Sequence, residues 1–391
     1  MNTTKSKYIN GPLNVIRLEG SINNIKKVLY IFMDLHVEVT NQTKCEDYLS
    51  EDIMKYVKEE LIKFSQDKTN KDKYIDFFME HRLDVTENMV MNYVYYKDKY
   101  IDEMQKFFLQ NFRKNTKEFN NVRFHYADIR SSKILFDYKN IDNILNNYNC
   151  GNYRQNNVTN ILNIYAMNLK YLSEVRNYLL GKTKTNKKQK YTVDIPFNKI
   201  EDLVNKYNHK DVKTKISALI EIYMTESNKL SNMILENHKL ILKHEEKCNT
   251  YFNEKGYRKK TKDELGNTSY YYDDNDIIQD IIKNHNKIFE QHMMVHALLM
   301  DMYFLRRFCD KDYITNGLFY GGTAHCAIYI NFLIKFFDFK ITHAAYSSID
   351  LDKLNKKLSD KLYTVDELNE YFYPDILLQC SDITKFPGKF E

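Results

Sequence analysis

The stretch that decides the expected fold is Lys27-Val-Leu-Tyr-Ile-Phe-Met-Asp-Leu-His36. Its apolar run, residues 28–33, ends abruptly in an acid and a histidine. Apolar runs of this length between polar residues are typical of buried strands in a parallel sheet. Because side chains alternate along an extended chain, Asp34 and His36 lie on the same side of it. The stretch therefore predicts a central strand that carries an acid and a histidine at its carboxyl end.

The same design recurs three times along the chain. Residues 74–84, 122–130 and 318–325 are apolar runs that end in polar residues, namely Glu80, then His125, Asp128 and Arg130, and then Gly321, Gly322 and His325. In open α/β sheets, ligands bind at the carboxyl ends of the strands. Four strands that deliver acid, histidine or arginine to that edge predict one shared polar site.

Patterns between these strands favour an α/β fold with a mostly parallel sheet and covering helices. We expect a hairpin from residues 14–20 and 28–34, and helices over 51–64, 100–112 and 323–337. Strands over 339–346 and 375–380 follow, and Ser50 and Thr364 are expected helix caps. Residues 132–310 are mostly helical in pattern. The expected architecture is an α/β domain from 1–131 plus 311–391, with a large helical insertion from 132–310.

Composition limits the classes of partner. A net charge of +5 over 391 residues gives no argument for nucleic acid, and the basic loop 181–190 is interpreted as a solvated linker. No window reaches 18 apolar residues, so a membrane span is not expected. No secretory signal is visible at the start. The six cysteines contain no CxxC pair. We therefore expect reduced thiols and a protein that is not secreted.

Three histidines lie on one face of the helix expected over 277–308. His285, His292 and His296 are spaced by 7 and 4 residues, and histidines at i and i+4 can bind one metal ion. The favoured interpretation is a buried face on which the imidazoles serve as hydrogen-bonding groups.

The strand ends themselves carry the expected chemistry. Asp34 could orient His36 as a base, or both could share a metal ion with Glu80 and His325. Carboxylates and histidines fit a divalent ion such as zinc or manganese, and they fit a metal-free acid–base site equally well.

Substrate contacts are expected from the remaining polar residues of the strand ends. Gly321 and Gly322 allow close approach of a ligand, and the helix that starts near residue 323 favours an anion there. His125 and Arg130 are further candidate substrate-binding residues, although pairing of Asp128 with Arg130 is the favoured interpretation of those two.

Two resemblances follow from these motifs. Phe32-Met-Asp-Leu-His36, Asn41-Gln-Thr-Lys-Cys45, Asp76-Phe-Phe-Met-Glu80 and Gly321-Gly-Thr-Ala-His325 resemble a family of uncharacterised proteins of mimivirus-like giant DNA viruses, which fits the AT-rich codon bias of the composition. That resemblance implies a location in the host cytoplasm or the virion.

More remotely, the order of motifs looks like the erythromycin-esterase-like and TraB/ChaN superfamily. Its members are α/β proteins with a helical insertion, including hydrolases and metal-dependent proteases. The resemblance implies that His36 and His325 are catalytic or ligand histidines, with Glu80 as the carboxylate. Met33 stands where that superfamily has glycine, and Asp34 where it has glutamate.

Two functions are therefore expected. The first is a hydrolase-like protein, either esterase-like or metal-dependent, acting on a small molecule or a peptide. The alternative is a non-catalytic virion or host-interaction protein that retains a degenerate enzyme scaffold.

Overall fold

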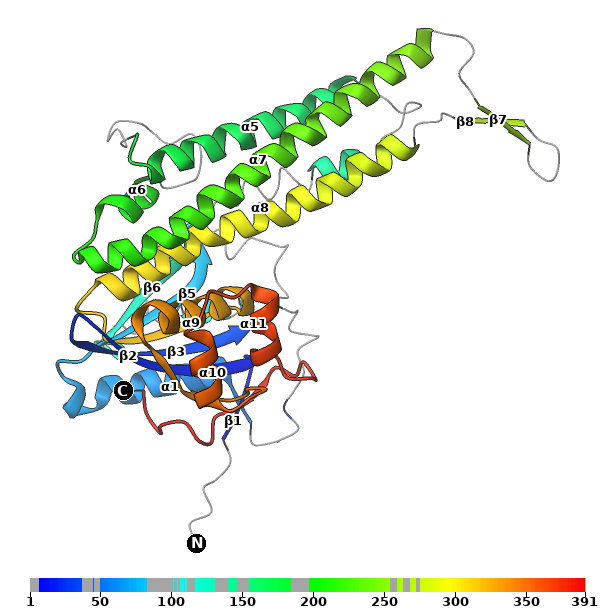
Figure 1. Ribbon diagram of the computed structural model, residues 1–391. Coiled ribbons are helices and arrows are strands. Elements are labelled where there is room, and N and C mark those ends of the chain that lie inside the picture. Colours follow the sequence, from blue (N-terminus) through cyan, green and yellow to red (C-terminus); the bar gives the residue numbers. More distant parts are fainter. Residues whose placement is uncertain are drawn as a thin grey trace. The chain divides into compact units, whose positions relative to one another are not determined.

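The chain divides into two compact units, each of which is described by itself. The computed structural model describes residues 7–36, 45, 50–82, 101, 104, 106–108, 110, 117–130, 140–145, 155–183, 197–253, 259–262, 268–271 and 275–390. Unit 1 comprises residues 1–129, 208–215 and 300–391, and unit 2 comprises 130–207 and 216–299 (Figure 1). The predicted domain boundaries at residues 131 and 311 stay a prediction, and unit 1 includes residues 208–215 and 300–310, which the sequence places in the insertion.

Unit 1 is built on a six-stranded sheet in the order β10-β2-β3-β9-β5-β6. Its strands are β2 (Asn14–Ile22), β3 (Ile25–Asp34), β5 (Ile75–Arg82), β6 (Val122–Asp128), β9 (Asn316–Gly322) and β10 (Lys340–Ala344). The four strands β3, β9, β5 and β6 run parallel to one another, and β2 is antiparallel to both β3 and β10. The predicted α/β class with a mostly parallel sheet is confirmed.

The predicted hairpin of β2 and β3 forms around Asn23 and Asn24. Both residues have positive φ, 51° and 65°, which is the backbone that a two-residue type I′ turn requires and that asparagine tolerates. Beyond the turn, the apolar run 28–33 of β3 is buried throughout, because β2 and β9 flank this strand and helices cover both of its faces.

Helices cover both faces of the sheet. On one face, α1 (Ile53–Gln66) packs Tyr56, Val57 and Leu61 against a cluster that includes Tyr30 and Leu318. The opposite face is covered by α9 (Thr323–Phe337) and by the end of α8 (Asn275–Asp310). There, the rings of Phe304 and Tyr329 contact Phe319 of β9.

Helix caps follow the chemistry that the sequence predicts, with one exception. Thr364 and Glu367 form the expected capping box at the start of α11 (Val365–Phe372), after α10 (Leu351–Leu358). Ser50 was the expected cap of α1, and this prediction is wrong. Asp52 caps α1 instead, since its carboxylate accepts the Met54 backbone N–H at 2.8 Å.

A second, small sheet ties the two ends of unit 1 together. Its strands are β1 (Tyr8–Asn10), β4 (Glu51–Asp52) and β11 (Cys380–Asp382), in the order β11-β1-β4. The last strand thus begins later than the predicted 375–380 and does not join the main sheet. Next to it, Cys45 and Cys380 form a disulfide, with Cα atoms 5.1 Å apart. The prediction of reduced thiols is wrong for this pair, because the fold brings together cysteines that are 335 residues apart.

Unit 2 is mostly helical, as predicted. It contains α5 (Gln155–Leu179), α6 (Phe197–Asn205) and the larger parts of α7 (Lys210–Asn253) and α8. A hairpin of β7 (Lys259–Lys262) and β8 (Thr268–Tyr271) follows α7 in the chain, within the region predicted to be mostly helical. Within the part of the chain that the structure describes, no helix combines the length and apolar character needed to cross a membrane.

Candidate functional site at the carboxyl edge of the sheet

The register of the parallel strands brings three predicted site residues to one edge of the sheet. Asp34, the last residue of β3, is level with Gly322, the last residue of β9. On the other side of β9, Met79 of β5 is level with Tyr320, so Glu80 lies one residue further toward the same edge. The prediction of a shared carboxyl edge for these strands therefore holds in the geometry of unit 1.

Asp34 holds His36 in a fixed orientation. The Asp34 Oδ2 atom lies 2.5 Å from His36 Nδ1 and also accepts the His36 backbone N–H at 2.9 Å. The Tyr320 hydroxyl donates to the other oxygen of Asp34 at 3.0 Å. His36 has a φ of 55°, a left-handed conformation that is uncommon for a residue with a side chain. The local contacts to Asp34 stabilise this strained turn.

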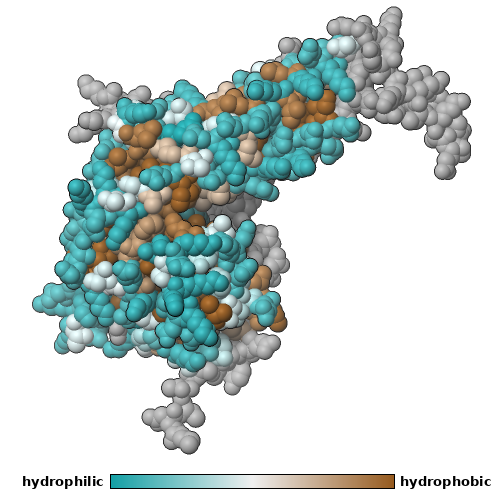
Figure 2. All heavy atoms as spheres, in the orientation of Figure 1, coloured by the Kyte–Doolittle hydropathy of each residue, from teal (hydrophilic) through white to brown (hydrophobic). Residues whose placement is uncertain are grey.

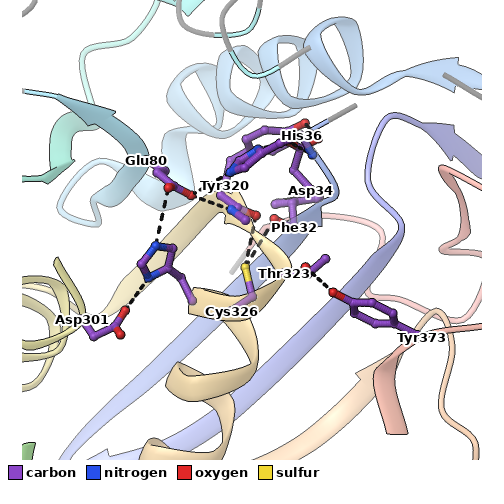
Figure 3. A network of polar contacts seen from close by, with 12 residues as sticks. Phe32, Asp34, His36, Glu80, Asp301, Tyr320, Thr323, Cys326 and Tyr373 are labelled. Atoms are coloured by element: carbon purple, nitrogen blue, oxygen red, sulfur yellow. Dashed lines mark hydrogen bonds and ion pairs between the residues drawn. The ribbon is translucent and has the colours of Figure 1, made fainter. Parts of the chain in front are cut away.

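Glu80 lies between two histidines. Its Oε2 atom is 3.4 Å from His36 Nε2, and its Oε1 atom is 3.5 Å from His325 Nε2. The Gly322 backbone N–H donates to Oε2 at 2.6 Å, next to the start of α9. A carboxylate is favourable at that position because the amino end of a helix carries partial positive charge. Figure 3 shows Glu80 beside the labelled His36.

The second histidine is held in the same manner as the first, by an acid that no strand-end motif contains. His325 Nδ1 lies 2.6 Å from Oδ1 of Asp301, a fully buried residue near the end of α8 (Figure 3). The result is a continuous series of contacts in the order Asp34, His36, Glu80, His325 and Asp301. Each imidazole has a carboxylate at Nδ1 and shares Glu80 at Nε2.

Gly322 makes the contact between His36 and Glu80 possible. A Cβ atom at this position would lie 2.8 Å from His36 Nε2 and 3.2 Å from Glu80 Oε2. Phe32 of β3 and Met79 of β5 both belong to the cluster on the α1 face of the sheet. Because side chains alternate along a strand, Asp34 lies on the same face as Phe32, and Glu80 lies on the face opposite to Met79. The His36 ring therefore crosses the end of β9 at Gly322, where no side chain blocks its path.

The electrostatics of the series make His36 a cation at neutral pH. Burial by itself lowers the pKa of the imidazole, but the hydrogen bonds and charges of Asp34 and Glu80 outweigh burial and raise the pKa to about 10. Its side chain is 33% exposed, whereas those of Glu80 and His325 are 8% and 7% exposed. His36 is therefore the member of the series that solvent reaches most easily.

Two further polar residues of α9 are engaged beside the series. The Thr323 and Tyr373 hydroxyl oxygens lie 2.5 Å apart. The Cys326 thiol donates to the Gly321 carbonyl at 3.3 Å, and burial raises its pKa. A buried thiol with a raised pKa is a poor nucleophile, so Cys326 has a packing role.

His125 lies elsewhere in unit 1. Its Nε2 atom contacts Asp76 at 2.6 Å, and its Nδ1 atom lies 3.2 Å from the Arg307 guanidinium. Asp76 also binds the Arg123 guanidinium through two hydrogen bonds of 2.7 and 2.6 Å. Asp76 is near the start of β5, so this cluster is several residues away from the carboxyl edge. Arg130 belongs to unit 2. The structure therefore does not bring His125 into the series that contains Glu80.

The five side chains of the series contact one another in a row and do not surround one common point, as the ligands of a metal ion would. Among the described residues, no three His, Cys, Asp or Glu side chains are grouped so that they could hold a metal ion. The two imidazoles contact different oxygens of Glu80, which separates them along the chain. The zinc or manganese site expected from Asp34, His36, Glu80 and His325 stays a prediction.

Comparison with known proteins identifies the family. Residues 7–391 match the family of unknown function DUF5847. The chain belongs to this family. It is 32% identical to uncharacterized protein R706 of Acanthamoeba polyphaga mimivirus over 99% of the chain and 97% of that relative. Uncharacterized proteins R161 and R160 of the same virus are 32% and 28% identical, each over 98% of the chain.

These comparisons settle the two resemblances differently. The resemblance to uncharacterised proteins of giant viruses is confirmed. The resemblance to the erythromycin-esterase-like and TraB/ChaN superfamily receives no support from them. No solved structure matches the chain.

Proposed function

We propose that unit 1 is a hydrolase-like acid–base centre of a giant-virus protein, with His36, Glu80 and His325 as the reacting groups and Asp34 as a positioning residue. The observation that supports the proposal is the pair of histidines, each held at Nδ1 by a carboxylate and directed at Nε2 toward Glu80. A carboxylate that fixes the tautomer and direction of an imidazole is a recurring device of general acid–base catalysis.

The raised pKa of His36 assigns it the role of proton donor. A hydrolysis needs a donor for the leaving group and an acceptor for the proton of the attacking water. His36 is protonated at neutral pH and partly exposed, so it can protonate a leaving group or stabilise negative charge on the substrate. The role of base then falls to Glu80 or His325. This reverses the assignment of His36 as a base, one of the sequence-based alternatives.

Glu80 and the two imidazoles also define how a metal ion would enter the chemistry. If both imidazoles were neutral, the Nε2 lone pairs of His36 and His325 would face the negative Glu80 carboxylate. This arrangement is repulsive unless a positive charge lies between the nitrogen and the oxygen atoms. Protons fill this role at His36. A zinc or manganese ion would compete with these protons, and its binding would have to draw the three groups toward one point. The test is the metal content of protein purified without chelator, measured by mass spectrometry for the wild type and for His36→Ala. A metal ion that is present in the wild type and lost in His36→Ala would indicate that the ion replaces the proton.

The activity test uses substrates of three classes, because ester, phosphoester and peptide hydrolysis all need the same two proton transfers. Chromogenic esters, chromogenic phosphoesters and fluorogenic peptides are incubated with the wild type and with His36→Ala and His325→Ala. We expect hydrolysis of one class and a loss of about 10²–10⁴-fold in each variant. The matched control is His343→Ala, which changes a histidine of β10 that contacts Thr342 and lies outside the series. Retained activity in both site variants would refute the proposal.

A second candidate function is supported by unit 2. Large apolar side chains are exposed on its helices, among them Met167, Ile222, Leu235, Phe289 and Met294. Figure 2 shows hydrophobic surface along these helices. Exposed apolar patches often mark protein–protein contacts. Under this alternative, the protein is a non-catalytic virion or host-interaction protein, and the buried ion pairs of unit 1 are a retained scaffold. Binding to the virus particle or to a host protein, unchanged in His36→Ala and His325→Ala, would favour it.

A further inference from the structure

Three stacked rings lie in the interior of unit 2. The His292 and His296 imidazoles of α8 stack with centroids 4.2 Å apart and planes 18° apart. The His296 ring stacks in turn on Tyr171 of α5, at 5.3 Å and 28°. The three side chains are 0%, 5% and 7% exposed. Two helices of unit 2 are therefore joined through a stack whose middle ring is an ionisable group.

The third histidine of the same face has a different environment. His285 Nδ1 lies 3.0 Å from the Tyr165 hydroxyl, which also accepts from the Asn237 amide. Its Nε2 atom lies 3.0 Å from a carboxylate oxygen of Asp142, so an acid is at hand if His285 takes up a proton. The predicted use of buried imidazoles as hydrogen-bonding groups is seen at His285. The stacked pair needs another account.

No ion pair joins His296 to a carboxylate of the described chain, and its Nε2 atom has no hydrogen-bond partner there. Arg130 is the charged group that acts on it, and a cation disfavours a second positive charge. On α7, Tyr223 acts on Tyr171, while Glu226 contacts Gln291 and Lys229. With burial as the largest cause, the pKa of His296 is lowered to about 3, and that of His292 also lies well below its usual value.

We propose that the Tyr171–His296–His292 stack is an acid-sensitive lock, which holds α5 against α8 while the imidazoles are neutral and opens unit 2 when they take up protons. The stack is most stable between neutral rings, because a charge on either imidazole is poorly solvated in this apolar interior and two imidazolium cations 4.2 Å apart repel each other. Within the described part of unit 2, no acid is paired with His296, so release of the helix pair into solvent is the route by which we expect a proton to be accommodated.

The direction and size of the effect follow from linkage. In the closed state the pKa of His296 is about 3, while in an opened state it returns to about 6.5. The lock is therefore fully effective above pH 6.5 and weakens as pH falls from 6.5 toward 3. Between pH 7.5 and pH 5, the protonation of His296 alone increases the equilibrium constant for opening about 30-fold.

The test measures opening directly in the full chain. Hydrogen–deuterium exchange followed by mass spectrometry is recorded from pH 7.5 to pH 5 and corrected for the intrinsic pH dependence of exchange. Peptides from α5 and from residues 280–299 of α8 report on unit 2, and peptides from α9 are the internal reference. We expect the opening constant of the unit 2 peptides to rise by at least 30-fold and that of the reference by much less.

Variants separate the stack from general acid sensitivity. His296→Phe keeps an aromatic ring in the middle of the stack and removes the ionisable group, so the acid response should fall by about 30-fold. His292→Phe provides a second variant in case the first fails to fold, which circular dichroism at pH 7.5 would reveal. The matched control is His238→Phe on α7, a partly buried histidine outside the stack. An unchanged acid response in His296→Phe and His292→Phe, or an equal loss in His238→Phe, would overturn the proposal.

Discussion

Gly322 is the position where a single methyl group tests the geometry of the candidate site. In Gly322→Ala, the new Cβ atom would lie 2.8 Å from His36 Nε2, and ordinary contacts begin at about 3.4 Å. The backbone at Gly322 has φ −58° and ψ 141°, a conformation that alanine adopts without strain. Any effect of the substitution therefore comes from the contact itself and not from the backbone.

The size of the effect can be worked out from the contacts. To restore 3.4 Å, the His36 ring must move by about 0.6 Å, which lengthens its 3.4 Å contact with Glu80 to about 4 Å. Overpacking typically costs about 1–3 kcal/mol, and weakening a partly exposed ion pair adds less than about 1 kcal/mol. We expect a loss of about 2 kcal/mol in the free energy of unfolding. The pKa of His36 should fall from about 10 but stay above 6.5, because Asp34 is untouched.

Two measurements check this prediction. The pKa of His36 is followed by NMR titration of its ring resonances, assigned by comparison with His36→Ala, and stability is measured by urea unfolding. The control is Gly388→Ala, where a Cβ atom would have nothing within 4 Å. If Gly322→Ala leaves both the pKa of His36 and the free energy of unfolding unchanged, the ring does not cross the end of β9 as described.

Three other predictions concern unit 1. Asp76→Asn should lower the free energy of unfolding by about 2–4 kcal/mol, because it leaves the partly buried Arg123 guanidinium without its counter-charge. Urea titration measures this loss, and a loss below about 1 kcal/mol would contradict the prediction. Replacing Cys45 and Cys380 by serine should cost about 2–5 kcal/mol, whereas equal melting temperatures with and without reductant would argue against the disulfide. Since the folded pKa of His36 is raised to about 10, its stabilising effect is complete below pH 6.5 and lost as pH rises through 10. Allowing for its exposure, His36→Gln should remove about 2 kcal/mol at pH 6.5 and almost nothing above pH 10.

The sequence predicted the parts of unit 1 that depend on local pattern. The apolar run of β3, the hairpin of β2 and β3 and the helix over 323–337 are each encoded within a few residues, and each forms as expected, although the turn at Asn23 and Asn24 is tighter than the predicted gap between residues 20 and 28. The meeting of Asp34, Glu80 and His325 was also predictable, because parallel strands deliver their carboxyl ends to one edge. What the pattern could not supply is the order of contacts, in which Glu80 is shared.

Asp301 shows why part of the site could not be predicted. It lies within Leu298-Leu-Met-Asp-Met-Tyr-Phe304, an apolar stretch of α8 that is interpreted as core by its composition. A single acid inside such a stretch is a usable signal, since a buried carboxylate needs a partner. Its partner is His325, 24 residues away on a different helix, and only the packing of α8 against α9 reveals it. The Cys45–Cys380 disulfide escaped prediction for a similar reason, because pairing over 335 residues leaves no local trace.

The way in which β9 enters the sheet explains why the site draws on both ends of the chain. β9 lies between β3 and β5, although the whole of unit 2 separates it from them in sequence. The Tyr320–Asp34 and Gly322–Glu80 contacts span 286 and 242 residues. The Asp34-x-His36 turn and Glu80 therefore cannot be joined to His325 and Asp301 until β9 is inserted. Completion of the sheet and assembly of the five-residue series are the same event, so a variant that disturbs β9 should lose both together.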